Sequence, residues 1–268
     1  MDALERINDL SAADWIRKNI DSTDNFESRS GNYVTHCIPN LFESYCKVFH
    51  NIYEDLSVAD HSITWDEISK RESADLDDPV EKLLHDATMV YGGEFDPNNL
   101  KRIRWSELAA RYGLQFHPEL NVDSFSRNFP TRSWPRYLIG PDEGMLDNLT
   151  CKEIVRSIAL ATSDFDLSQQ CFFLYDLIAT TNYESDLLYK GSLKSVFDTP
   201  KLEDVSGTPT YWWPDDNKWL VCTDWDLTFT LIGGSETFIA SVISNPELEC
   251  LPVEPSNRID YKSDKVNS

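Results

Sequence analysis

Two aspartates placed one residue apart carry the strongest chemical signal in the sequence. Asp224 and Asp226 follow the apolar run 219–223, a pattern that predicts a β-strand presenting both carboxylates at its end. Carboxylates held at this spacing can share a magnesium ion, with one acting as a nucleophile and the other transferring protons. The pattern therefore raises a metal-dependent hydrolase as one hypothesis.

Segment 219–228 resembles the first motif of the haloacid dehalogenase-type phosphatases, which would make Asp224 the nucleophile and Asp226 the acid–base residue. That family also needs a downstream Ser or Thr, a Lys and a second acidic pair, whereas this chain ends at residue 268. We therefore favour carboxylates that cap a turn between two antiparallel strands. The five histidines form no metal-binding pair and no Gly-x-Ser-x-Gly motif occurs, so we assign no catalytic, cofactor or metal residue, and the sequence leans away from an enzyme.

Aromatic residues gather just before these aspartates. Trp212 and Trp213 precede Asp215 and Asp216, and two further tryptophans follow within the next dozen residues. Such a cluster can anchor a partner or a sugar, or it can belong to the core. We take the first alternative as a hypothesis, with Trp212, Trp213, Asp215, Asp216, Asp224 and Asp226 as candidate partner-binding residues on one face.

The charge of the chain restricts its partners. With 46 acidic and 24 basic residues the formal net charge is -22, which repels a nucleic-acid backbone and favours a basic protein. Only residues 101–140 invert this balance, with seven bases and three acids. That island either pairs internally with nearby carboxylates or binds an anion.

No apolar run approaches the length of about 20 residues that a membrane span requires. The first residues have neither a basic nor an apolar segment of the kind that signal peptides contain. We therefore expect a cytoplasmic protein with no membrane partner. The sequence leaves the oligomeric state open.

Helical and strand patterns alternate irregularly along the chain, and no long crossover helices link the strands. This favours an α+β fold with a mostly antiparallel sheet. Residues 1–30 are predicted to be an acidic helical extension and linker, and residues 31–268 a single large domain. Strands are expected at 33–38, 171–175, 187–197, 218–223 and 248–253, and helices at 146–161 and 236–244 and from residues 65 and 105 onward.

The C-terminal third resembles an uncharacterised family of bacterial cytoplasmic proteins. The matching segments are YWWPDD at 211–216, WLVCTDWD at 219–226, TLIGGS at 230–235 and Leu-Glu at 248–249. The resemblance implies a shared fold and carries no known activity. Together with the charge, it leads us to expect a non-enzymatic, immunity- or antitoxin-like protein that neutralises a basic partner through an acidic, aromatic-bearing face. A metal-dependent hydrolase using Asp224 and Asp226 is the alternative.

Overall fold

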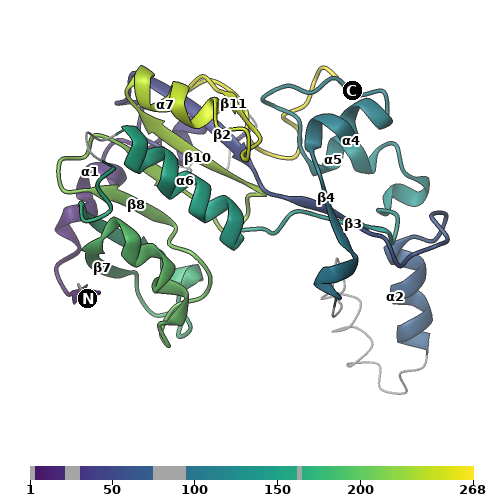
Figure 1. The fold of residues 1–268 in the computed structure, drawn as a ribbon, viewed down its shortest axis with the longest axis horizontal. Coiled ribbons are helices and arrows are strands. Elements are labelled where there is room, and N and C mark those ends of the chain that lie inside the picture. Colours follow the sequence, from purple (N-terminus) through teal and green to yellow (C-terminus); the bar gives the residue numbers. More distant parts are fainter. Residues whose placement is uncertain (1–3, 22–30, 75–94, 162–164) are drawn as a thin grey trace. The chain divides into compact units, whose positions relative to one another are not determined.

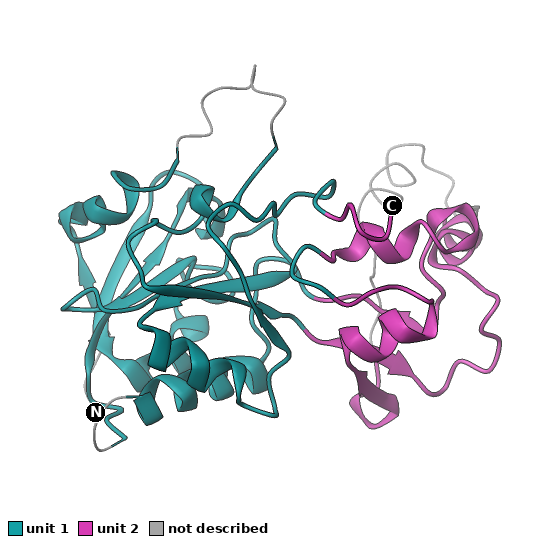
Figure 2. Cartoon of the chain, turned by 90° about the horizontal axis from the view of Figure 1, so that it is seen from above, with its two compact units in different colours: residues 1–50, 117–119, 142–263 teal, residues 51–116, 120–141, 264–268 magenta. Residues whose placement is uncertain are grey.

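The computed structural model describes residues 4–21, 31–74, 95–161 and 165–268. The chain divides into two compact units, shown in separate colours in Figure 2. Unit 1 comprises residues 1–50, 117–119 and 142–263, and unit 2 comprises residues 51–116, 120–141 and 264–268. Both units combine helices with antiparallel strands, which confirms the predicted α+β class. The chain passes between the units several times, and the single domain predicted over residues 31–268 stays a prediction.

The large sheet belongs to unit 1. Its described strands are β1 (Glu5–Ile7), β2 (Ser44–Phe49), β6 (Gln170–Tyr175), β7 (Leu187–Ser192), β8 (Tyr211–Pro214), β9 (Leu220–Cys222), β10 (Phe229–Gly234) and β11 (Cys250–Pro252). They follow the order β1-β7-β6-β8-β9-β10-β2-β11, and each neighbouring pair is antiparallel. The consecutive strands β8, β9 and β10 form a meander, which antiparallel pairing allows because short turns can join neighbours.

Both faces of this sheet are apolar, and successive residues of the strands β6 to β9 enter different cores. On β8, Trp212 joins one hydrophobic cluster and Trp213 joins the other. Helices α6 (Asn148–Ala161) and α7 (Glu236–Ile243) cover the first face and lie side by side in Figure 1. The second face is covered by the 3-10 helix η1 (Leu10–Ala13), helix α1 (Asp14–Arg17) and residues 34–38.

The N-terminal residues differ from the prediction of a separate extension. Strand β1 pairs with the edge strand β7, and Ala13 and Ile16 are 0% and 1% exposed within the second core. Residues 22–30 of the predicted linker lie outside the described residues. Because residues 5–17 supply a strand paired with β7 and a helix that buries Ile16 in the second core, this part of the predicted extension is integral to unit 1.

Several local signals are confirmed. At the start of α2 (Trp65–Ala74), Thr64 N donates to Glu67 Oε2 at 3.0 Å and Glu67 N to Thr64 Oγ1 at 3.4 Å, as the capping box predicts. Helix α4 (Trp105–Arg111) also begins where expected. The strand predicted at 33–38 is wrong, because that segment forms the 3-10 helix η2 (Val34–His36) beneath the sheet.

Unit 2 contains a small sheet in the order β4-β3-β5, made of β3 (Ile52–Asp55), β4 (Leu100–Ile103) and β5 (Leu138–Ile139). Unit 2 also contains the helices α2, α4 and α5 (Val122–Ser126). Four bases of the island at 101–140 pair with carboxylates of this unit: Lys101 and Arg111 with Glu54, Arg127 with Asp123, and Arg136 with Asp55. For these four the internal-pairing interpretation is confirmed.

In the part of the chain that the structure describes, no helix is both long enough and apolar enough to cross a membrane.

Candidate functional site

The two tryptophans predicted as partner anchors are core residues. Trp212 and Trp213 are both 0% exposed. The Trp212 ring packs edge-on against Trp219 at 5.8 Å, and the Trp213 ring stacks on Phe172 at 5.4 Å. Because they occupy successive positions of β8, one indole fills each core. This corrects the prediction, since neither ring reaches the surface.

The four predicted aspartates do not form one face. Asp215 and Asp216 lie in the turn between β8 and β9, whereas Asp224 and Asp226 lie in the turn between β9 and β10. Consecutive turns of an antiparallel meander lie at opposite ends of its strands, and the pairing of Trp212 with Val221 and of Val221 with Ile232 fixes this register. The expected face is therefore divided between two ends of the sheet.

Asp215 and Asp216 are each neutralised by a lysine. Asp215 Oδ1 lies 2.7 Å from Lys190 Nζ, and Asp216 Oδ2 lies 2.7 Å from Lys218 Nζ. The Lys218 pair raises the pKa of that lysine. With their charges compensated locally, these two aspartates add little to a negative surface potential.

Asp224 and Asp226 form the turn that the sequence favoured. Asp226 N donates to Asp224 Oδ1 at 3.1 Å, and Leu227 N donates to Asp224 O at 3.1 Å. The flanking strands β9 and β10 are antiparallel neighbours, so the interpretation as a turn cap is confirmed. Among the described residues, no group of three or more His, Cys, Asp or Glu side chains is arranged to hold a metal ion.

The charges of this turn act on two further carboxylates that are distant in sequence, Glu143 and Asp176. We call Glu143, Asp176, Asp224 and Asp226 the acidic end. Burial raises the pKa of Asp224, and the charge of Asp226 raises it further against the effect of the hydrogen bond from Asp226 N. Burial and then the charge of Asp226 raise the pKa of Glu143. Burial also raises the pKa of Asp176, with a smaller contribution from Asp224.

Tight backbone packing places Glu143, whereas the end of β6 and a helix cap place Asp176. Gly144 N donates to Leu227 O at 3.0 Å, and Gly144 has φ +66°. A Cβ at Gly144 would lie 2.7 Å from Trp225 Cα, so glycine is required for this segment to lie against the β9–β10 turn. Asp176 follows β6 directly and caps the 3-10 helix η5 (Leu177–Ala179), where Ala179 N donates to Asp176 Oδ1 at 3.4 Å.

The β8–β9 turn pairs its aspartates with lysines, whereas the acidic end forms no such pair within the described part of the chain. Among the residues that the structure describes, none of its four carboxylates forms an ion pair with Lys, Arg or His. Three exposed apolar side chains lie within two residues of Glu143 or Asp176 in the sequence. Met145, Leu177 and Ile178 are 37%, 40% and 48% exposed. Uncompensated carboxylates beside exposed apolar groups form a surface suited to a cationic, partly apolar partner.

A buried histidine, His50, connects two strands of the large sheet to the segment that carries Glu143. His50 follows β2, and its Nδ1 lies 2.6 Å from Asp142 O. Its Nε2 lies 3.0 Å from Thr230 Oγ1. Thr230 Oγ1 in turn lies 2.8 Å from Thr223 Oγ1. Burial lowers the pKa of His50 to about 4, so the ring is neutral at pH 7. In that form Nδ1–H donates to the Asp142 carbonyl and Nε2 accepts from Thr230. The histidine thus ties β2 and β10 to the segment that carries Glu143.

Sequence reasoning identified Asp224 and Asp226 but missed Glu143, Asp176 and the apolar residues beside them. Their sequence signals were weak. Asp176 directly follows a strongly apolar strand, and Glu143 precedes a glycine. Only the strand order, which places β6 and β9 on either side of β8, brings Asp176 to the same end as Asp224.

A scan against models of known protein families finds no match, and searches of curated proteins and of solved structures find no similar protein. The resemblance to an uncharacterised bacterial family stays a prediction.

Proposed function

We propose that the protein is a non-enzymatic binding protein, immunity- or antitoxin-like, that captures a basic protein partner. Its contact surface is the acidic end, in place of the face with Trp212 and Trp213 that the sequence suggested. The observation that carries the proposal is the group of four carboxylates that form no ion pair among the described residues, close in sequence to exposed Met145, Leu177 and Ile178.

The carboxylates favour a cationic partner for two reasons. Their uncompensated charge, within a chain of net charge -22, speeds the approach of a positive surface. The pKa of Asp176, of Asp224 and of Glu143 is raised, so each ionised form is less favourable in the free protein than in water. A lysine or arginine brought close by a partner relieves that cost.

The apolar side chains contribute affinity, whereas the charges contribute the association rate. Burying Leu177 or Ile178 fully against a partner removes apolar surface from water, worth about 25 cal/mol per Å². Association of this kind is expected to combine a salt-sensitive on-rate with an off-rate set by the apolar contacts.

Capture with paired charge variants tests the proposal. Wild-type protein, an Asp224→Asn/Asp226→Asn variant and an Asp215→Asn/Asp216→Asn control are immobilised and exposed to native lysate. Both variants remove two charges, but only the first alters the acidic end. We expect the wild type and the control to retain the same basic protein and the first variant to lose most of it. Retention of no basic protein, or equal losses in both variants, would contradict the proposal.

A further inference from the structure

The connection between β6 and β7, residues 176–186, belongs to the same end of the large sheet as the acidic end. The pairing of β6 with β8 and of β8 with β9 aligns the end of β6 with the end of β9. Burial is the main cause that raises the pKa of Asp176, and the charges of Asp224 and Asp186 raise it further. Since Asp176 begins the connection and Asp186 ends it, the connection adjoins the acidic end.

A neighbouring backbone segment holds this connection in place and joins it to Met145. Two backbone hydrogen bonds link residues 179–181 to residues 204–206, with N–O distances of 2.9 and 3.1 Å. A Cβ at Gly207 would lie 2.7 Å from Met145 Cγ, so Met145 packs directly on the next residue of the same segment. The connection and Met145 are therefore held against one stretch of backbone.

Tyr183 projects from the connection with its side chain 66% exposed. Within the described residues, its ring makes no aromatic contact and its hydroxyl makes no hydrogen bond. Its backbone has φ +55°, in the left-handed region that is unfavourable for a bulky side chain, and Asn182 Oδ1 supports the turn by accepting from Glu184 N at 3.2 Å. Strained residues gather at binding sites, and tyrosine is among the side chains that dominate binding energy at interfaces. Tyr183 is thus placed to be the aromatic anchor that Trp212 and Trp213 do not supply.

The aromatic ring and the carboxylates around it match the two parts of a guanidinium group. Glu184 follows Tyr183 and, like the four carboxylates of the acidic end, forms no ion pair among the described residues. A guanidinium stacks flat on an aromatic ring while its N–H groups bond carboxylates at its edge. An ammonium is a compact, strongly hydrated charge without a flat face. A ring among carboxylates therefore distinguishes arginine from lysine.

We propose that Tyr183 stacks on an arginine of the basic partner and makes the acidic end selective for arginine over lysine. This role of Tyr183 rests on the proposed function, because it assigns the partner side chain that the acidic end receives. The carboxylates attract both cations, whereas the ring favours the guanidinium. For a ring in an exposed position, a preference of about threefold in affinity is expected.

Two short peptides test this selectivity. One is a capped glycine peptide that carries two arginines, and the other carries two lysines at the same positions. Dissociation constants are measured at low ionic strength from the backbone amide signals of Ile178 and Asp226 in nitrogen-15 NMR spectra, so that binding is followed at the acidic end itself. We expect the wild type to bind the arginine peptide about threefold more tightly than the lysine peptide.

Tyrosine variants show whether the ring causes this preference. Tyr183→Leu should abolish the preference and keep the affinity for the lysine peptide, which also shows that the variant is folded. Tyr183→Phe keeps the aromatic face and should keep the preference. Tyr261→Leu is the matched control, because Tyr261 is 64% exposed and lies in the segment after β11, and it should leave the preference unchanged.

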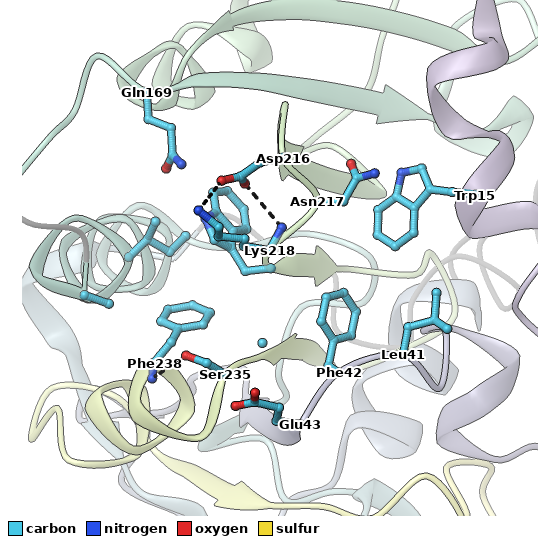
Figure 3. Close-up of a pocket in the computed structure, with 14 residues that line it drawn as sticks. Trp15, Leu41, Phe42, Glu43, Gln169, Asp216, Asn217, Lys218, Ser235 and Phe238 are labelled. Carbon is cyan, nitrogen blue, oxygen red and sulfur yellow. Dashed lines mark hydrogen bonds and ion pairs between the residues drawn. The ribbon is translucent and has the colours of Figure 1, made fainter.

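Charge variants separate the contribution of the carboxylates from that of the ring. Asp224→Asn/Asp226→Asn should weaken the binding of both peptides by similar factors and leave the preference for arginine in place. Asp215→Asn/Asp216→Asn removes two charges at the β8–β9 turn and should leave both affinities nearly unchanged. Figure 3 shows the reason, since the Asp216 carboxylate is already bound by Lys218, whose Nζ lies 2.7 Å away.

Two kinds of failure are distinguishable. Equal affinities of the wild type for both peptides, a preference that survives Tyr183→Leu, or a preference that Tyr261→Leu also abolishes would overturn the role of Tyr183 and leave the proposed function standing. If neither peptide shifts the signals of Ile178 and Asp226, the acidic end does not receive cations, and the proposed function fails together with the role of Tyr183.

Discussion

Acidification is expected to destabilise unit 1 through His50. Burial lowers the pKa of this histidine from 6.5 to about 4. Between these two values the unfolded chain binds a proton that the folded chain does not bind. At about 1.36 kcal/mol for each pH unit, the gap of about 2.5 units corresponds to about 3 kcal/mol. The stability that neutral His50 contributes is fully present above pH 6.5 and is lost as the pH falls toward 4.

The carboxyl groups nearby act in the opposite sense. The raised pKa of Asp142, Glu143, Asp176 and Asp224 means that the folded state gains protons on these groups before the unfolded state does. Acidification through their folded pKa therefore stabilises the fold. A His50→Gln variant carries the same carboxyl groups, so the difference between wild type and variant isolates the histidine.

Urea denaturation at several pH values between 7 and 4 measures this difference. We expect the stability advantage of the wild type over His50→Gln to shrink by about 3 kcal/mol across that range. Ring signals of His50 in NMR spectra should remain those of a neutral imidazole down to about pH 4. A difference in stability that does not change with pH, or a His50 ring that titrates near pH 6.5, would refute the reasoning.

Three other changes have defined outcomes. Ile16→Ala should lower the free energy of unfolding by about 2–5 kcal/mol, because the side chain is 1% exposed in the second core; a change within about 0.5 kcal/mol in urea denaturation would return residues 1–30 to a dispensable extension. Asp224→Asn should raise the urea midpoint at pH 7, since it removes a charge with a raised pKa and keeps the Oδ1 acceptor. This gain should diminish on acidification, and a lower midpoint at pH 7 would contradict the unfavourable ionisation inferred for Asp224. Magnesium or manganese should leave the melting temperature unchanged, whereas a bound site at a 100-fold excess over Kd would add about 2.7 kcal/mol; a shift abolished by Asp226→Asn would favour the hydrolase hypothesis.

Elements with strong local signals could be predicted from the sequence. The Thr64 capping box and the apolar run in β6 were located to within a residue or two, because hydrogen bonds and side-chain types within a few positions determine them. Segment 33–38 has the composition of a strand but packs as a 3-10 helix against the sheet. Its contacts with the sheet outweighed its local preference for a strand. A pattern within a single sequence does not report such contacts.

The candidate site depended on topology in the same way. Asp215 and Asp216 lie close in sequence to Asp224 and Asp226, which suggested a shared face. A meander that reverses at each turn separates the two pairs. Asp176 lies far away in sequence but joins the acidic end through the position of β6 in the sheet. Such groupings follow from strand order, which the sequence pattern left undetermined.

The salt dependence of association with the captured basic protein tests the central claim most directly. Association rates are measured by stopped flow from low to physiological ionic strength for the wild type, Asp224→Asn/Asp226→Asn and Asp215→Asn/Asp216→Asn. We predict that the wild type and the second variant slow alike with salt, and that the first variant associates more slowly at low salt with a shallower dependence. Equal rates and slopes for all three proteins would contradict the assignment of the acidic end as the partner-binding surface.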